Sequence, residues 1–390
     1  MPHATEKYKL LVLSPNLETN LGHFFSYCKT LQEAAKINGW EFAAAIPENC
    51  QINTTPSSWY KILSTSTLKY GPRFIKRIYN KFCYRRSLSK FLASHILPGQ
   101  KTIIFTEHFS RHRLRALLYS LFFLPKKNTS VWLLYRDYPT NYRLTKDALF
   151  FKKCHFFIAS ILKKSNFRLL TDCDLLQSPL QTFFGRDFSL FPIIEPLSLT
   201  HKTSSLHNIP SPPKNKTVCW LAGRSNKEKG SDIIEKIFYH CESHKVPIHF
   251  ITSKILDVHA QHRFHYIDIS FLPEILSTSA YIEQFARTDV FLIPYCKNHY
   301  KWKTSGVFVE AIAAGKPVLV TEGTWMAHEL QKFDLHKLIT SWDAEDIIKK
   351  ISFIRNNQET KENIRLMQQH YLNEYSATAF AAALQKLATS

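Results

Sequence analysis

The regular alternation of short apolar runs with helical patterns, on both sides of one polar segment, limits the fold of this chain most. The polar segment runs from Leu199 to Lys216 and contains Ser204, Ser205 and Pro210-Ser-Pro-Pro213. Turn formers at a stop in apolar periodicity indicate a linker. Apolar strands that alternate with helices favour parallel sheets covered by helices. A length of 390 residues also exceeds what one ordinary hydrophobic core holds.

We therefore expect an α/β protein with two doubly wound, Rossmann-like domains. Residues 1–200 are expected to form the N-terminal domain, 201–216 the linker and 217–370 the C-terminal domain. Residues 371–390 are expected to form a helix that packs back on the N-terminal domain. Doubly wound domains bind ligands at the carboxyl ends of their strands, so we expect the ligand in a cleft between the domains.

The apolar runs place the main elements. In the first half, strands are predicted at Tyr8–Ser14, Glu41–Ile46, Thr102–Thr106 and Ser130–Tyr135, with a helix from His23 to about Gly39. In the second half, strands are predicted at Thr217–Ala222, Pro247–Thr252, His265–Ile269, Val290–Pro294 and Lys316–Thr321. Helices are predicted at Ser231–His244 and Gly306–Ala314, and Asp232 and Glu235 are spaced as a capping box for the first of these.

The net charge of +20 is concentrated in the first half of the chain. Residues 1–205 hold 29 Lys and Arg against 12 Asp and Glu, whereas residues 206–390 hold 22 against 19. Between Asn49 and Thr106 there are ten basic residues and no acidic one. Such a field recruits nucleic acid, anionic lipid or phosphorylated substrates.

Cysteines and apolar runs indicate the compartment. The eight cysteines form no Cys-x-x-Cys pair, which argues against a disulfide framework or a structural zinc site and favours a reducing cytosol. The longest largely apolar run, Ala116–Leu124, is about half as long as a bilayer span. Residues 1–6 have no signal-peptide pattern. We expect a cytoplasmic protein.

The strongest local motif is the segment from Gly223 to Gly230, directly after a predicted strand and before a predicted helix. Its glycines let the backbone approach a ligand, and a helix N-terminus offers free N–H groups and a positive dipole end. Arg224 supplies a planar fork and Lys229 a point charge, which suits a pyrophosphate. The alternative is a solvated basic loop.

The second motif is centred on Glu310, the one charged residue between Gly306 and Gly315. A buried carboxylate needs a partner. Ribose hydroxyls would satisfy it, as they do in dinucleotide-binding folds, and an ion pair with a neighbouring Lys or Arg is the alternative. Ser305 and the amides of Gly306 and Val307 form a second helix N-terminus beside it.

These two segments resemble glycosyltransferase family 4, whose members have the GT-B fold. The resemblance lies in Gly-Arg-x4-Lys-Gly from Gly223 and in Ser-Gly-x3-Glu-Ala-x3-Gly-Lys-Pro-Val from Ser305. It covers nearly all of the C-terminal half, and the N-terminal half only in outline. It implies that Arg224 and Lys229 hold the donor diphosphate and that Glu310 holds the donor ribose. Gly223, Ser305, Gly306 and Val307 are expected to contribute to donor binding.

The sequence departs from the family at Trp302, where members often have a first glutamate that touches the donor sugar. This leaves the identity of the sugar open. The resemblance also places Gly22 in a Gly-rich loop beneath the donor phosphates. His108, next to Glu107 at the end of a predicted strand, is a catalytic candidate together with Arg224 and Lys229, and a structural histidine is the alternative.

Further polar residues follow the predicted strands. Arg136 and Asp137 come after the strand that ends at Tyr135. Asp172 and Asp174 spell the Asp-x-Asp motif with which metal-dependent GT-A glycosyltransferases bind Mg²⁺ or Mn²⁺. Because the rest of the chain resembles GT-B enzymes, which need no metal, we expect no metal and no other cofactor.

A basic stretch from Arg73 to Lys90 predicts a cationic amphipathic helix. Its apolar residues, including Ile75, Ile78 and Phe82, recur near helical spacing. The predicted membrane-binding residues are Arg73, Lys76, Arg77, Lys81, Arg85 and Arg86. Such helices lie in the interface of anionic membranes, where each basic residue contributes about 1 kcal/mol. Arg111, Arg113 and Arg115 extend the patch, and an ordinary surface helix is the alternative.

Together these patterns predict a glycosyltransferase that uses a nucleoside diphosphate sugar. The acceptor is expected to be lipid-linked or a lipopolysaccharide or polysaccharide, at the inner face of the cell membrane, and the resemblance implies retention. No nucleic-acid partner is expected. The alternatives are a sugar-nucleotide 2-epimerase of the same fold, which turns over UDP-sugar without an acceptor, and a non-catalytic membrane- or RNA-binding protein.

Overall fold

The computed structural model describes residues 8–20, 22–52, 54–65, 72–138, 145–163, 166–193, 216–223, 226–253, 264–273 and 276–390. Within these ranges the side chains of residues 73, 74, 76, 77, 145–147, 278 and 344 are not described. The chain forms two compact units. The first comprises Met1–Glu195 and Ser376–Ser390, and the second comprises Pro196–Tyr375. The predicted linker at 201–216 lies outside the described residues, except for its last residue.

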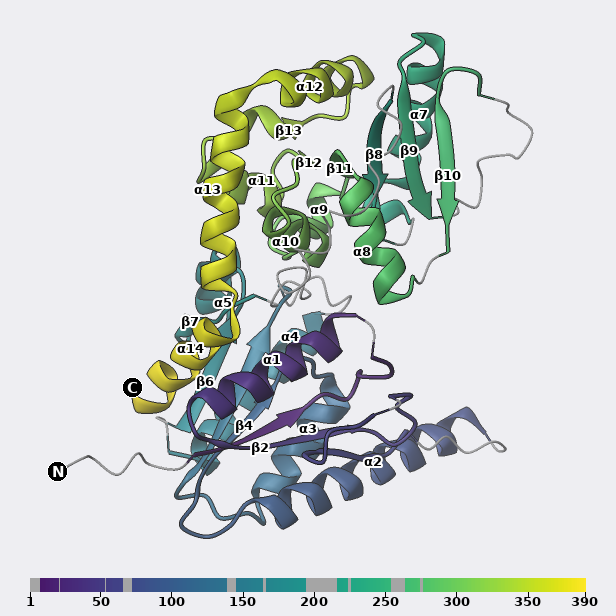
Figure 1. The fold of residues 1–390 in the computed structure, drawn as a ribbon. Coiled ribbons are helices and arrows are strands. Elements are labelled where there is room, and N and C mark those ends of the chain that lie inside the picture. Colours follow the sequence, from purple (N-terminus) through teal and green to yellow (C-terminus); the bar gives the residue numbers. More distant parts are fainter. Residues whose placement is uncertain are drawn as a thin grey trace, which may run out of the picture. The chain divides into compact units, whose positions relative to one another are not determined.

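Seven parallel strands form the sheet of the first unit, in the order β3-β2-β1-β4-β5-β6-β7 (Figure 1). They are β1 Tyr8–Leu13, β2 Glu41–Pro47, β3 Trp59–Leu63, β4 Lys101–Thr106, β5 Thr129–Tyr135, β6 Phe167–Thr171 and β7 Phe188–Leu190. Central strands of a parallel sheet are covered on both faces, which explains their nearly unbroken apolar runs. Leu10, Leu11 and Ile104 have no exposed surface.

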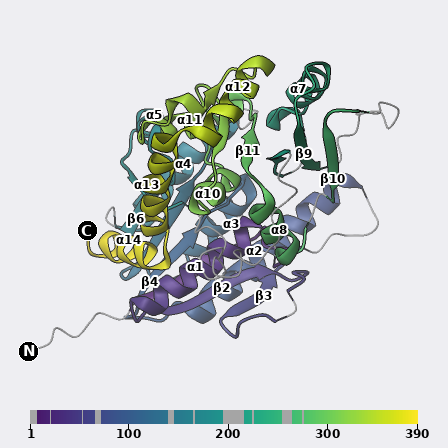
Figure 2. The same ribbon diagram turned by 45° about the horizontal axis from the view of Figure 1, so that its top comes forward.

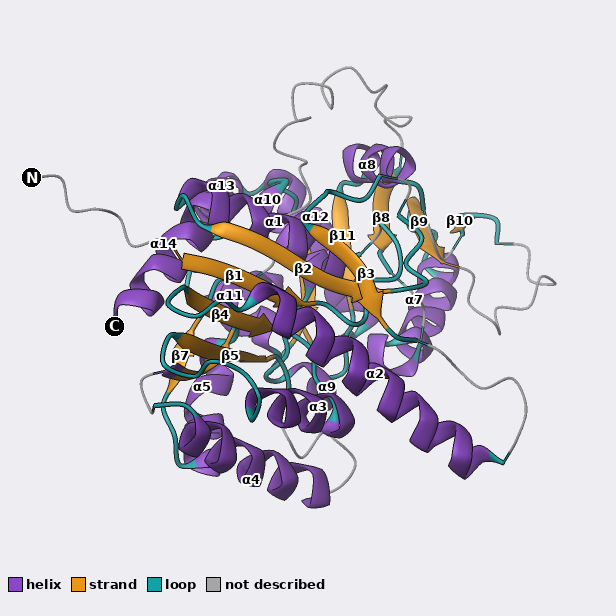
Figure 3. Cartoon of the chain, turned by 90° about the horizontal axis from the view of Figure 1, so that it is seen from below, coloured by secondary structure: helices purple, strands orange, loops and turns teal. Residues whose placement is uncertain are grey.

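Helices cover both faces of this sheet. They are α1 His23–Ile37, α2 Arg73–His95, α3 Arg111–Leu121, α4 Thr145–Ile161, α5 Asp174–Phe184 and α14 Ala377–Thr389. The helices α2, α3 and α4 lie side by side on one face (Figure 3). From β1 to β2 the chain moves along the sheet in the opposite direction to its steps from β4 to β5 and from β5 to β6. A right-handed crossover therefore places α1 on the opposite face. There α1 lies beside α14 (Figures 1 and 2).

The second unit has six parallel strands in the order β10-β9-β8-β11-β12-β13. They are β8 Thr217–Leu221, β9 Ile248–Ser253, β10 Asp268–Leu272, β11 Val290–Ile293, β12 Val318–Thr321 and β13 Ile339–Thr340. Its helices are η3 Lys227–Lys229, α7 Ser231–Ser243, α8 Thr278–Arg287, α9 Lys297–Tyr300, α10 Gly306–Ala313, α11 Trp325–Gln331, η4 His336–Leu338, α12 Ala344–Asn356 and α13 Gln358–Glu374. None of the described helices of the chain is long and apolar enough to cross a membrane.

Two local predictions in the second unit are wrong. The strand expected at His265–Ile269 is β10, which begins at Asp268, because Glu242 holds the amides of His265, Tyr266 and Ile267 outside the sheet. The capping box of Asp232 and Glu235 does not form. Gly230, in the left-handed region at φ 78°, caps α7 without a side-chain hydrogen bond.

The last helix belongs to the first unit. Helix α13 continues to Glu374, so the segment that joins the first unit begins at Ser376 rather than at 371. The Asn38 side chain donates to the Ala381 carbonyl at 2.8 Å, and the Tyr8 hydroxyl donates to the Ala388 carbonyl at 3.1 Å. Phe380 is fully buried, with its ring centroid 5.4 Å from that of Tyr27.

These contacts predict that Phe380→Ala destabilises the first unit by roughly 3–5 kcal/mol, because truncating a buried phenylalanine leaves a cavity. Gln385→Ala, at an exposed position of the same helix, is the matched control and should change stability by less than about 0.5 kcal/mol. Urea unfolding measures the difference, followed by the fluorescence of the first unit's tryptophans, Trp40, Trp59 and Trp132, with those of the second unit replaced. Equal midpoints for both variants would contradict the packing of α14.

Candidate functional site

Both sheets reverse their strand order at one point, and most predicted site residues follow the strands at those points. The reversal lies between β1 and β4 in the first unit and between β8 and β11 in the second. In doubly wound sheets, ligands bind outside the carboxyl ends of the strands at this switch point. Gly22 and His108 come after β1 and β4, and Gly223 and Lys229 come after β8.

Gly230 sets the geometry of the loop after β8. A Cβ atom at this position would lie 2.2 Å from the carbonyl oxygen of Pro294, at the end of β11, and φ is 78°. Only glycine allows this close approach without a shift of the backbone. The amide of Cys296 donates to the Glu228 carbonyl at 2.8 Å, which ties the same two loops together. The start of α7 is therefore held against the end of β11.

Lys229 lies over an aromatic residue that follows β11. Its Nζ atom is 5.4 Å from the centroid of the Tyr295 ring, and a Cβ atom on Gly223 would be 3.0 Å from the same Nζ. The half-buried ammonium group thus lies beside the exposed backbone of Gly223. Arg224 lies outside the described residues. A cation held beside an open glycine backbone at a switch point can bind a phosphate.

Tyr295 connects Lys229 to the helix that carries Glu310. The buried Tyr295 hydroxyl hydrogen-bonds to the side chain of Ser305, and burial raises the pKa of Tyr295. Ser305 also caps α10, because its Oγ accepts from the Phe308 amide at 3.3 Å. Gly306 is exposed and Val307 is half-buried at this N-terminus. The structure thus brings Gly223, Lys229 and Ser305 together through one tyrosine.

Glu310 has a hydrogen-bond partner, and among the described residues this partner is a tyrosine. The Tyr281 hydroxyl, on α8, donates to Oε2 of Glu310 at 2.5 Å. Burial raises the pKa of Glu310 to about 7, although the hydrogen bond from Tyr281 opposes the rise. The residue as a whole is half-buried. Within the described part of the chain, the ion-pair alternative therefore has no support.

In the first unit, Gly22 and His108 border the start of α1. Gly22 has φ 85° and precedes the first residue of α1, and the first turn contains no acidic residue. The exposed ring of His108 is T-shaped to Phe24, with centroids 6.0 Å apart. The Thr106 hydroxyl donates to the His108 carbonyl at 3.3 Å. The imidazole is therefore accessible at the carboxyl end of β4.

Three residues that follow neighbouring strands form a buried ion cluster. Arg136, after β5, is 3.1 Å from Glu107, after β4, and 3.0 Å from Asp172, after β6. The guanidinium also lies 4.5 Å from the ring centroid of Tyr27 on α1. Glu107 and Asp172 are each 5% exposed. The carboxylate of Asp172 is thus engaged by an arginine, which weakens the alternative of an Asp-x-Asp metal motif.

The cluster holds two carboxyl groups but one guanidinium, and burial raises the pKa of Glu107 to about 7. The charge of Arg136 lowers this pKa and the charge of Asp172 raises it further. One neutral acid, one carboxylate and one guanidinium is the least costly state for buried groups of this kind.

Helix α2 matches the predicted basic helix, but its apolar residues point in two directions. Tyr84, Leu88, Phe91 and Leu92 are buried, whereas Ile75, Ile78, Tyr79 and Phe82 are 41–52% exposed. Lys81 and Arg86 are exposed and Arg85 is half-buried. The side chains of Arg73, Lys76 and Arg77 lie outside the described side chains.

Sequence reasoning missed the residues that connect the site. Tyr281 and Tyr295 hold Glu310 and Ser305, and Tyr27 lies under Arg136. A tyrosine directly after a predicted strand, as at Tyr295, was the available signal. Ser253, the last residue of β9, was also missed; its hydroxyl donates to the Gly223 carbonyl at 3.0 Å. Trp302 lies half-buried, with Lys301 Nζ 4.7 Å from the centroid of its ring.

No protein-family model matches the chain, and no curated protein sequence matches it. Solved structures do match. A sucrose-phosphate synthase from Thermosynechococcus elongatus is 13% identical, with a TM-score of 0.63, and the match covers 98% of each chain. A glycosyltransferase from Rickettsia africae is 10% identical, with a TM-score of 0.62 and 98% of each chain covered. The trehalose-6-phosphate protein from E. coli bound with UDP-2-fluoro glucose is 12% identical, with a TM-score of 0.66, covering 98% of this chain and 99% of that one.

These matches establish the fold class. Over almost the full length of the chain, the fold, with two parallel-sheet α/β domains, is that of GT-B glycosyltransferases. The predicted fold class is thereby confirmed. At 10–13% identity the likeness shows the fold, and what the site does is a separate question.

The buried cluster predicts a pH-dependent stability. Because the folded pKa of Glu107 is about 7, above that of an unfolded glutamate, folding takes up a proton and loses stability as pH rises from about 4.5 to 7. The free energy of unfolding of the wild type should therefore fall by up to about 3 kcal/mol between pH 5 and pH 8 through this group. Glu107→Gln should not show this fall.

Urea unfolding of both proteins at pH 5 and pH 8 measures this effect. Glu48→Gln, which neutralises an exposed glutamate after β2, is the control and should leave the pH profile unchanged. Parallel profiles for Glu107→Gln and the wild type would mean that Arg136 keeps Glu107 ionised throughout.

Proposed function

We propose that this protein transfers a sugar from a nucleoside diphosphate sugar to the hydroxyl group of an acceptor. The observation that carries the proposal is the connected set of Lys229, Tyr295, Ser305 and Glu310 at the switch point of the second sheet. A cation, a helix N-terminus and a half-buried glutamate match the diphosphate and ribose of such a donor. The E. coli structure of similar fold is bound with UDP-2-fluoro glucose.

The proposed chemistry places each group at a stated part of the donor. Lys229, Arg224 and the N-terminal amides of α7 and α10 stabilise the charge that develops on the leaving diphosphate. Glu310 accepts hydrogen bonds from the ribose. Since this charge stabilisation needs no metal, we propose that no metal is required. Retention and membership of glycosyltransferase family 4 belong to the same proposal, supported by the motifs from Gly223 and Ser305.

The donor site predicts the effect of three substitutions. Arg224→Ala and Lys229→Ala should each weaken donor binding about ten- to a hundredfold, because a charge-assisted hydrogen bond contributes roughly 1.5–3 kcal/mol. Glu310→Gln should weaken binding of free nucleoside diphosphate too, since its partner is the ribose. Calorimetric titration with the UDP-, GDP-, ADP- or CMP-sugar that gives the largest thermal shift measures the affinities.

Lys236→Ala, on the exposed side of α7, is the control for Lys229→Ala and should bind like the wild type. Wild-type donor affinity in both Arg224→Ala and Lys229→Ala would overturn the site. Loss of sugar nucleotide in the absence of any acceptor would favour the epimerase, and no binding of any sugar nucleotide would favour a non-catalytic protein.

We further propose that the first unit docks on the inner face of an anionic membrane, where the acceptor is lipid-linked. The exposed apolar residues on α2, beside Lys81 and Arg86, support this proposal. Helices α2, α3 and α4 lie on the same face of the sheet (Figure 3), and Phe123, after α3, is 74% exposed and Phe156, on α4, is 64% exposed. Aromatic and basic side chains on one exposed face are typical of interfacial binding.

Vesicle flotation tests the docking. Replacing Arg73, Lys76, Arg77, Lys81, Arg85 and Arg86 by Gln should abolish binding to anionic vesicles, and salt should release the wild type, because charges are screened over about 8–10 Å. The control replaces six exposed basic residues of the second unit, namely Lys236, Lys245, Lys337, Lys349, Lys361 and Arg365. Equal binding to neutral and anionic vesicles would contradict the proposal.

A further inference from the structure

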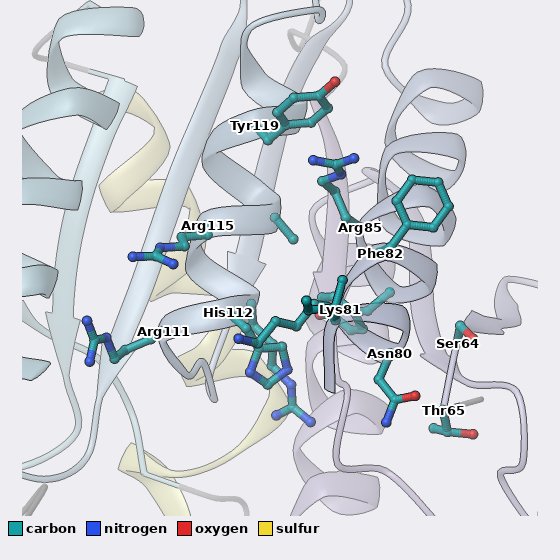
Figure 4. A pocket seen from close by; sticks show the side chains of 14 residues that line it. Ser64, Thr65, Asn80, Lys81, Phe82, Arg85, Arg111, His112, Arg115 and Tyr119 are labelled. Carbon is teal, nitrogen blue, oxygen red and sulfur yellow. The ribbon is translucent and has the colours of Figure 1, made fainter. Parts of the chain in front are cut away.

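A groove of about 1000 Å³ lies between α2 and α3 in the first unit. Lys81 and Arg85 line it from α2, and Arg111, Arg113 and Arg115 line it from α3 (Figure 4). Among the described residues that line it, none is acidic. The sequence from Asn49 to Thr106 contains no acidic residue, so α2 and the strand before it cannot supply one. The groove therefore concentrates positive charge.

Arg113 shows that this charge is not balanced within the groove. Its Nε is buried and has no hydrogen-bond partner among the described residues. Its guanidinium lies 5.9 Å from the centroid of the Tyr84 ring, and Nη2 donates to the Pro15 carbonyl at 3.4 Å, a long hydrogen bond. Burial lowers the pKa of Arg113, and the phenol of Tyr84 opposes this only in part. A partly buried guanidinium without a carboxylate is costly unless an anion approaches it.

The start of α3 adds to this imbalance. Arg111, His112 and Arg113 occupy its first turn, which contains no acidic residue. The N-cap, Ser110, makes no capping hydrogen bond, and its Oγ pairs with Nδ1 of His112 at 2.9 Å instead. Basic residues at the positive end of a helix dipole are unfavourable in isolation. An anion at this N-terminus would relieve both the repulsion and the unsatisfied amides.

The opposite end of the groove is aromatic. Arg85 lies 4.3 Å from the centroid of the Tyr119 ring and 5.4 Å from that of Phe82 (Figure 4). Tyr119 is 43% exposed and Phe82 is 48% exposed. Stacking holds the guanidinium in place before a ligand arrives. Arg111 and Arg115, in contrast, turn toward Phe150 of α4, at 4.9 and 4.8 Å from its ring centroid.

We infer that this groove binds a phosphate or diphosphate ester, with Arg113 and the start of α3 at the anion and the aromatic residues beside the organic part. Arginine forks suit phosphate oxygens, and an amphiphilic ester suits a groove that is basic at one end and aromatic at the other. Helix α3 begins three residues after His108, at the carboxyl end of β4. Use of the groove for a phosphate-bearing acceptor rests on the transferase function proposed above; binding of the ester does not.

Calorimetric titration with inorganic pyrophosphate tests the site. All proteins carry Lys229→Ala, so that the proposed donor site contributes little. Arg113→Met, and separately Lys81→Met with Arg85→Met, should lower the affinity about tenfold or more, because each variant removes positive charge from the lining of the groove. Arg86→Met with Lys90→Met is the control, since these exposed residues have the same spacing on α2 but do not line the groove.

The outcomes separate the possibilities. Loss of affinity in the groove variants but not in the control supports the site, whereas equal loss in both, or no saturable binding by the parent, overturns it. If Arg113→Met lowers the thermal stability, the result for the variant of exposed Lys81 and half-buried Arg85 decides. Vesicles of phosphatidic acid and of phosphatidylserine at equal surface charge identify the source. A preference for phosphatidic acid that the groove variants lose assigns a lipid headgroup, and pyrophosphate binding without that preference assigns a soluble ester.

Failure of this inference can be distinguished from failure of the transferase proposal. When Lys229 is left unchanged, the groove variants should bind the donor like the wild type, because the groove and the donor residues belong to different units. Absence of donor binding with intact pyrophosphate binding would refute the transferase and leave the groove in place.

Discussion

The approach of Gly230 to the Pro294 carbonyl is the contact on which the site of the second unit depends. A Cβ atom would lie 2.2 Å from that oxygen, so any other residue would push α7 away from the end of β11. With the two loops held together, Lys229 lies over Tyr295, and Tyr295 in turn reaches Ser305 at the start of α10. The absence of a side chain at Gly230 thus allows groups that are far apart in the sequence to come together.

The buried carboxyl groups of the two units have different partners. Glu107 lies within a closed cluster with Arg136, and its side chain is 1% exposed, so it acts on the fold rather than on a ligand. Glu310 has a neutral phenol as its partner and is half-buried as a residue. A phenol satisfies one carboxylate oxygen without neutralising its charge, which leaves hydrogen-bonding capacity for a second partner. Of these two glutamates, Glu310 is therefore the one whose partner does not neutralise its charge.

The basic residues of the first unit lie in two kinds of environment. On α2, exposed residues such as Lys81 and Arg86 add to a general field that salt screens. At the start of α3, Arg113 is partly buried, and its charge opposes the helix dipole. A field attracts any polyanion, whereas a partly buried guanidinium selects a group that fits against it. The groove between the two helices can therefore distinguish one anion from another, which the net charge of the chain alone cannot.

The sequence by itself determined the fold class, and it located the segments from Gly223 and Ser305 between a strand and a helix or directly before a helix. Apolar periodicity marks strands and helices because it records local burial, and the motifs from Gly223 and Ser305 lie within short stretches of chain. Only the tertiary structure decided that Tyr281 is the partner of Glu310, that Glu107, Arg136 and Asp172 form one cluster, and that α2 and α3 enclose a basic groove. These contacts join residues on different strands and helices, and strand order and helix packing, which no local pattern encodes, bring them together.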